Sequence, residues 1–118
     1  MTHALIVDDN MIISRAIEDR LSCLGFDTFD LTWTEAQALE AAYDHPPDLV
    51  VVGDSIAGGS SMEAAQHIAA QFDAPILMVA AGRCEVLRHL PDGASVDGPF
   101  ALSDIGTAVT RARARPPS

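Results

Sequence analysis

Pro47-Asp48-Leu49-Val50-Val51-Val52-Gly53 contains the clearest strand in this chain of 118 residues. Its apolar residues are continuous rather than alternating, which is typical of a strand buried on both faces of a parallel sheet. Pro46 and Pro47 interrupt the chain before it, and the small residues of 55–60 predict a loop after it. The stretch therefore predicts an α/β protein organised around a central strand at 48–52.

A second continuous run, residues 4–7, precedes two aspartates and predicts another buried strand. Asn10 is a suitable N-cap for a helix that Gly25 ends. Residues 26–31 alternate and predict a strand, and the spacing of Thr32 and Glu35 predicts a capping box for the next helix. The apolar positions of the first helix are expected on its inner face: Ile13, Ala16, Ile17, Leu21 and Leu24.

The second half continues the alternation of strands and helices. Ser60 and Glu63 predict another capped helix, residues 75–80 a fourth strand, and Arg83 to Leu90 a short helix. A brief fifth strand at 93–97 and a final helix capped by Ser103 complete the pattern. The predicted fold class is α/β, a doubly wound five-stranded parallel sheet with five helices. We expect one domain over 1–118, with a short basic and proline-rich tail at 111–118.

The composition argues against two classes of function, nucleic-acid binding and membrane spanning. The formal net charge is −10, which argues against nucleic-acid binding because phosphate contacts need a positive surface. All seven basic residues are arginines, and the chain contains no lysine. No apolar run approaches the roughly 18 residues of a membrane span. Cys23 and Cys84 are far apart and predict reduced thiols in a cytoplasmic protein.

Doubly wound folds place their sites at the carboxyl ends of the strands, where this chain carries several aspartates. Asp8 and Asp9 follow the first strand, and Asp54 comes shortly after the third. Two adjacent carboxylates are suitable ligands for Mg²⁺. The alternative is structural, with one aspartate capping the next helix and the other facing water, and the residues alone leave both open. No spacing of catalytic side chains indicates an enzyme.

The chain resembles the receiver domains of response regulators, which have a flavodoxin-like fold. The resemblance rests on Val-Asp-Asp-Asn at 7–10, the strand of 47–52, Gly58 with Met62-Glu63, Pro-Ile-Leu-Met at 75–78, and Gly93-Ala94 with Pro99-Phe100. It covers essentially the whole chain, in the family's order. It implies that the acidic pair binds Mg²⁺, that an aspartate ending the third strand accepts a phosphoryl group from a histidine kinase, and that a hydroxyl and a lysine sense it.

Most of these family residues are absent. The acceptor position is Gly53, the hydroxyl position is Ala80, and the lysine position is Gly98. Asp54 lies one residue beyond the acceptor position, where a regular strand directs its side chain to the opposite face. A bulge at Gly53 would instead turn Asp54 into the site, which makes Asp54 an alternative phosphoacceptor.

We therefore predict a stand-alone, degenerate bacterial receiver in two-component signal transduction that binds a protein independently of phosphorylation and is not an enzyme. The expected partner is a histidine kinase, phosphotransfer protein or downstream regulator. This partner would contact the fourth helix, fifth strand and fifth helix at 83–115. A homodimer is left open. Neither nucleic acid nor a membrane is expected to bind. No cofactor is required, although Asp8 and Asp9 would hold Mg²⁺ weakly. The alternatives are a phosphorelay receiver phosphorylated on Asp54 and a ligand or metal sensor using the acidic pocket of Asp8, Asp9 and Asp54.

Overall fold

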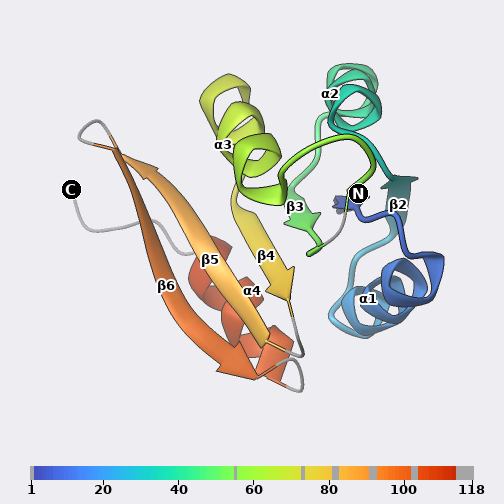
Figure 1. The fold of residues 1–118 in the computed structure, drawn as a ribbon. Coiled ribbons are helices and arrows are strands. Elements are labelled where there is room, and N and C mark those ends of the chain that lie inside the picture. Colours follow the sequence, from blue (N-terminus) through green and yellow to red (C-terminus); the bar gives the residue numbers. More distant parts are fainter. Residues whose placement is uncertain are drawn as a thin grey trace.

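Six strands form one sheet in the computed structural model, which describes residues 2–54, 56–72, 74–80, 83–90, 93–101 and 104–113 (Figure 1). Their order across the sheet is β2-β1-β3-β4-β5-β6. The first four pair in parallel, and β5 and β6 are antiparallel to their neighbours. The bounds are β1 (His3–Val7), β2 (Thr28–Thr32), β3 (Leu49–Val52), β4 (Ile76–Ala80), β5 (Arg83–Leu90) and β6 (Gly93–Ala101).

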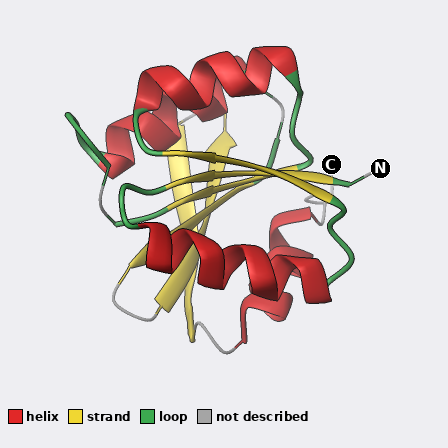
Figure 2. Ribbon diagram, turned by 90° about the vertical axis from the view of Figure 1, so that its right-hand side faces the viewer, coloured by secondary structure: helices red, strands yellow, loops and turns green. Residues whose placement is uncertain are grey.

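Helices cover both faces of the sheet, as the edge-on view in Figure 2 shows. The described residues contain α1 (Met11–Cys23), α2 (Glu35–Asp44), α3 (Ser61–Gln71) and α4 (Ile105–Arg113). The inner faces of α1 and α4 share one apolar cluster, and those of α2 and α3 share the other. Within these ranges no helix is long and apolar enough to cross a membrane.

The central position of β3 explains its continuous apolar sequence. All four of its residues are fully buried. Leu49 and Val51 contribute to the cluster under α1 and α4, whereas Val50 and Val52 contribute to the cluster under α2 and α3. Successive side chains of a strand point to opposite faces, so a strand with helices on both sides needs apolar residues at every position.

The doubly wound α/β class is confirmed, but the helix predicted at 83–90 is wrong. Arg83–Leu90 is strand β5, antiparallel to β4 with Ala80 opposite Arg83. Cys84 and Val86 pack in the cluster that contains α4, and Leu87 packs on the opposite face. The expected brief parallel strand at 93–97 is the longer antiparallel β6. An antiparallel hairpin needs only a short turn, whereas a parallel return needs a crossover of a dozen or more residues.

Helix capping matches the sequence at three positions. Asn10 accepts hydrogen bonds from the N–H groups of Ile12 and Ile13 at 3.0 and 3.4 Å. Gly25 follows α1 with φ +101°, a conformation that favours glycine. Ser60 caps α3 by accepting from Glu63 N at 3.4 Å. Ser103, the expected cap of the last helix, and the tail residues 114–118 lie outside the described residues.

The capping box predicted at Thr32 is wrong. Thr32 is the last residue of β2, and its hydroxyl donates to the Ile6 carbonyl at 3.1 Å. The cap of α2 is Thr34, which accepts a bond from Gln37 N at 3.1 Å. The Gln37 side chain in turn accepts from Trp33 N at 3.0 Å. Sequence spacing alone did not separate the two threonines, because a glutamate and a glutamine each lie three residues downstream.

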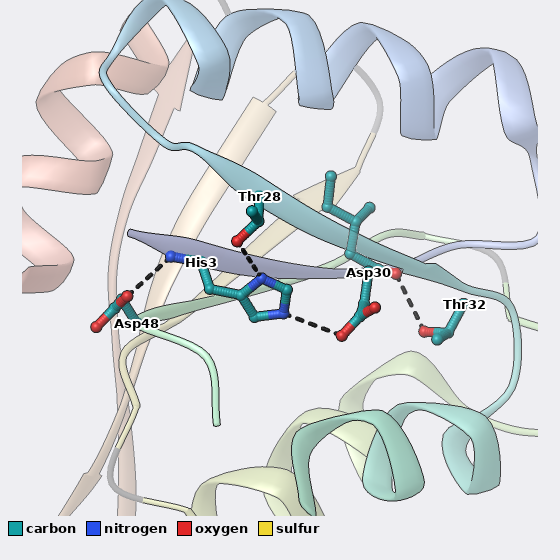
Figure 3. A network of polar contacts seen from close by, with 6 residues as sticks. His3, Thr28, Asp30, Thr32 and Asp48 are labelled. Carbon is teal, nitrogen blue, oxygen red and sulfur yellow. Dashed lines mark hydrogen bonds and ion pairs between the residues drawn. The ribbon is translucent and has the colours of Figure 1, made fainter. Parts of the chain in front are cut away.

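A polar network joins the amino ends of β1, β2 and β3, away from the carboxyl edge (Figure 3). His3 Nδ1 lies 2.8 Å from Thr28 Oγ1, and His3 Nε2 lies 2.9 Å from Asp30 Oδ2. The His3 backbone N–H donates to Asp48 Oδ2 at 2.8 Å. These bonds connect residues that lie far apart in the sequence and hold the amino ends of β1, β2 and β3 together.

Replacing Thr34 with Ala should lower the free energy of unfolding by about 1 kcal/mol, because the N-cap acceptor for Gln37 N is lost. Thr34→Ser is the control, since a serine hydroxyl keeps the N-cap acceptor for Gln37 N. Urea denaturation should show the larger loss for Thr34→Ala. The reverse order would contradict this assignment of the cap.

Candidate functional site

Polar residues gather where β1 and β3 end. Asp8 and Asp9 follow β1 directly, and Gly53 and Asp54 follow its neighbour β3. Asp8 and Gly53 are buried, whereas Asp9 and Asp54 are exposed. The carboxyl edge of the sheet therefore holds one internal carboxylate between two carboxylates at the surface.

Asp8 is held in place mainly through its backbone and one carboxylate oxygen. Its side chain is 1% exposed, and Oδ1 accepts a bond of 2.7 Å from Asn10 N. The Asp8 N–H donates to the Thr32 carbonyl at 2.9 Å, and the Ser14 hydroxyl donates to the Asp8 carbonyl at 3.5 Å. No described residue forms a hydrogen bond with Oδ2. A buried carboxylate oxygen therefore remains without a described partner.

The electrostatic setting of Asp8 favours its neutral form. Burial raises the pKa of this carboxyl above its ordinary value of 3.8, and the charges of Asp9 and Asp54 raise it further. The hydrogen bond from Asn10 N opposes the shift without reversing it. The three predicted acidic residues are thus close enough to interact, although only Asp8 is buried.

Gly53, the predicted acceptor position, leaves its side-chain space to Asp8. Its N–H donates to the Val7 carbonyl at 2.7 Å, which draws the ends of β3 and β1 together. A Cβ built on Gly53 would lie 1.6 Å from Asp8 Oδ2 and 2.8 Å from Asp8 Cβ. No side chain fits at this position unless Asp8 moves.

A pocket of about 240 Å³ lies beside Gly53. Its lining combines acidic, basic, hydroxyl and apolar side chains: Gly53, Asp54, Ser61, Met78, Val79, Arg83 and Glu85. Asp54 therefore faces the same pocket that Gly53 borders. Sequence reasoning missed Arg83 and Glu85, because a helix at 83–90 would have carried them away from the sheet edge. Their assignment to a strand would have revealed them.

Ala80 and Gly98 stand at the positions where the resemblance implies a hydroxyl and a lysine, and the structure describes them to different extents. The side chain of Ala80 lies outside the described residues, although its backbone ends β4. Gly98 lies in β6 with φ +127°, a conformation in which any other residue is strained. The glycine at the position of the family's lysine is therefore adapted to the backbone of this hairpin.

The donor set is small for a resident Mg²⁺. Asp8 Oδ2 accepts no hydrogen bond from a described residue, and Asp9 is the adjacent carboxylate. Across the described part of the chain, no group of three or more His, Cys, Asp or Glu side chains is arranged to hold a metal ion. Gly53 adds no side-chain ligand. One or two carboxylates completed by waters are an ordinary donor set for Mg²⁺, so Asp8 and Asp9 remain its predicted ligands.

A doubly wound sheet with acidic residues at its carboxyl edge matches known signalling proteins. The chain is 31% identical over 108 residues to the transcriptional regulatory protein KdpE of Mycobacterium tuberculosis, covering 88% of this chain and 47% of that protein. It is 35% identical over 81 residues to a protein-glutamate methylesterase/protein-glutamine glutaminase of Halobacterium salinarum, covering 69% of this chain and 23% of that protein. The chain thus spans less than half the length of these two relatives. No protein-family model matches it.

Solved structures of response regulators resemble this chain as well. The receiver domain of the response regulator PhyR from Erythrobacter litoralis superimposes with a TM-score of 0.72 at 30% identity, covering 94% of this chain and 88% of that one. PhyR of Bartonella quintana, seen in complex with the anti-sigma factor NepR, has a TM-score of 0.60 at 19% identity over 94% of this chain and 47% of that one, and shows the fold alone. This chain belongs to the receiver-domain family of response regulators.

Gly53→Ala should destabilise the domain by about 1–3 kcal/mol, since the new methyl group overlaps the Asp8 carboxylate. A double-mutant cycle with Asp8→Ala should recover much of that loss, and urea denaturation measures both. Gly59→Ala is the control, because its added Cβ would lie 3.8 Å from its closest neighbour, Ile56 Cδ1. Strictly additive effects of the two substitutions would contradict the proposed overlap.

Asp8→Asn should raise the free energy of unfolding at neutral pH. A carboxyl whose folded pKa is raised binds its proton more tightly in the folded state than in the unfolded chain. The wild type therefore loses stability as pH rises from about 4 through the folded pKa, and the variant lacks this loss.

Thermal unfolding from pH 4 to pH 8 measures the difference. Asp9→Asn is the matched control, because Asp9 is exposed and should change the melting temperature less. A lower melting temperature for Asp8→Asn across this range would contradict the assignment.

Proposed function

We propose that this receiver domain acts by binding another protein and that phosphorylation does not control it. One observation carries the proposal: the side-chain space at the acceptor position is occupied by the Asp8 carboxylate, and Gly53 has nothing to phosphorylate. Protein binding needs only a surface, whereas phosphoryl transfer needs a nucleophilic oxygen at this point. The proposal assigns the domain no catalytic activity of its own.

The sensing positions support the same view. The chain has no lysine, and Ala80 and Gly98 offer neither a hydroxyl nor a cation. A ligand shifts a conformational equilibrium only when it contacts the two states differently. A phosphoryl group attached nearby would therefore have few contacts with which to favour one state.

The proposed partner surface is the region expected at 83–115, of which the structure describes β5, β6 and α4. It differs from the sequence-based expectation, since β5, β6 and α4 form it and no helix occupies 83–90. The complex between PhyR of Bartonella quintana and an anti-sigma factor shows that a protein with this fold binds a regulatory protein. We propose a histidine kinase, a phosphotransfer protein or a downstream regulator for this chain. A homodimer and a cytoplasmic location remain part of the proposal.

Asp54 is the alternative acceptor, because it lines the pocket beside Gly53 and is exposed to solvent. Phosphorylation there would use the same edge of the sheet, one residue beyond the usual position. We propose that Mg²⁺ binds weakly and is not required, since Gly53 adds no side-chain ligand to Asp8 and Asp9.

Treatment with acetyl phosphate and Mg²⁺ tests the proposal on wild type, Asp54→Ala and Gly53→Asp. We expect the ¹⁵N–¹H NMR spectra of all three proteins to show no donor-dependent change across β5, β6 and α4. The affinity for a partner identified by pull-down should likewise be independent of the donor. Circular dichroism confirms that Gly53→Asp is folded, since this variant must displace Asp8.

Two results would overturn the proposal. One is a wild-type phosphoryl adduct, seen by mass spectrometry, that shifts β5 and β6 and disappears in Asp54→Ala. The other is a donor response acquired by Gly53→Asp alone.

A further inference from the structure

The outer edge of β6 is unpaired among the strands that the structure describes. β6 is the last strand of the sheet, and β5 is its one described strand partner (Figure 1). α4 packs against β4, β5 and β6, which centres this helix over β5. Gly98 and Ala101 of β6 are exposed. The backbone N–H and C=O groups of such an edge form hydrogen bonds when another strand pairs with them.

The regular part of this edge is short and has a defined centre. Gly93 is the first residue of β6, and Gly98 has a φ of +127°, which departs from extended backbone. Pro99 has no N–H group to donate. Residues 93–97 are therefore the segment that can pair as a regular strand, and Ser95 is its middle residue.

An antiparallel copy of residues 93–97 complements this edge. Successive residues of a strand direct their backbone groups alternately to its two sides, so every second residue of the segment presents its N–H and C=O outward. A two-fold axis at Ser95 places Ser95 opposite its own copy and Gly93 opposite Asp97 of the second copy. The outward groups of the two strands then meet as donor–acceptor pairs, whichever alternate set points outward.

The charges of the segment also permit this pairing. Asp97 is the one charged residue within 93–97, and an axis at Ser95 keeps the two copies of Asp97 at opposite ends of the paired segment. The whole chain has a formal net charge of −10, so two copies repel each other. A strand edge with a single charge is therefore a favourable place for a second copy to approach closely.

The opposite edge of the sheet lacks this self-complementarity. β2 is the other terminal strand, and Asp30 is the middle one of its five residues. Antiparallel pairing of two β2 strands over their full length would place Asp30 opposite its own copy. Like charges in directly opposed positions of a sheet are destabilising. β6 is thus the edge that suits self-association.

We propose that two copies of this domain associate by antiparallel pairing of β6, with the two-fold axis at Ser95 and one continuous sheet across the interface. This inference rests on the proposed protein-binding function and gives the homodimer of that proposal a surface and a register. The contact is made mainly by the backbone of one strand, so the interface is small and the dimer depends on concentration.

Sedimentation velocity over a range of protein concentrations, without a phosphodonor, measures the monomer–dimer equilibrium. Ser95→Glu should weaken dimerisation about fivefold, because two glutamates then face each other in one pair. Ser95→Lys should weaken it to a similar extent. An equimolar mixture of these two variants should recover the dimer as a heterodimer, since opposite charges then meet at the axis.

Ser22→Glu is the matched control for the added charge. Ser22 is exposed on α1, which lies away from β6 (Figure 1), so this variant should dimerise like the wild type. Circular dichroism compares the fold of each variant with that of the wild type.

Amide hydrogen exchange of the wild type, followed by NMR at low and high protein concentration, tests the register directly. We expect the exchange of every second amide within 93–97 to slow as the concentration rises, because the outward amides become bonded. This measurement needs no substitution, so it decides the question even if Ser95→Glu does not fold.

A wild type that stays monomeric at all concentrations would overturn the proposal and leave the edge to a strand of another protein. Protection of 93–97 that is independent of concentration would overturn it too, because another part of the same chain would then cover the edge. A dimer that Ser95→Glu leaves unchanged, or a mixture no stronger than its two variants alone, would also overturn it. A donor-dependent response to acetyl phosphate would overturn the proposed function separately, since these measurements contain no donor.

Discussion

The contact between Asp8 and Gly53 determines what this domain can do at its carboxyl edge. β1 and β3 are parallel neighbours, and the bond from Gly53 N to the Val7 carbonyl brings their ends together. The Asp8 side chain then fills the volume that a side chain at 53 would need. Asp8 and a side chain at 53 cannot both occupy this space in the observed arrangement. This steric conflict supports the proposal that phosphorylation does not control the domain.

The parallel half of the sheet could be predicted from sequence, and the antiparallel half could not. The runs at 4–7, 48–52 and 75–80 are apolar because helices cover both faces, and this leaves a clear signal. Arg83–Leu90 mixes charged and apolar residues, so its pattern fits a short helix as well as a strand, and pairing with β4 and β6 decides between them. Pro91-Asp92-Gly93, a typical turn sequence directly after this run, was the signal for a hairpin.

The sequence predicted that Asp8, Asp9 and Asp54 lie at one edge of the sheet, but it did not predict their burial or hydrogen bonding; their functional role stays a prediction. Order along the chain placed Asp8, Asp9 and Asp54 at one edge, because parallel strands end together there. It did not show that Asp8 is buried, with one oxygen that no described residue bonds, while Asp9 and Asp54 are exposed. Arg83 and Glu85 entered the site only through the hairpin. The same local ambiguity affected the cap of α2, where Thr32 serves the sheet and Thr34 the helix.

A buried carboxylate with an oxygen that no described residue bonds lowers stability, which makes the state of Asp8 the central physical claim of this account. The most direct test is the pKa of Asp8, measured from the ¹³Cγ chemical shift of ¹³C-labelled aspartate across a pH titration. The account predicts a midpoint above the ordinary value of 3.8, because Asp8 is buried beside Asp9 and Asp54. A midpoint at or below 3.8 would mean that Oδ2 is solvated or bonded to a donor, and would contradict it.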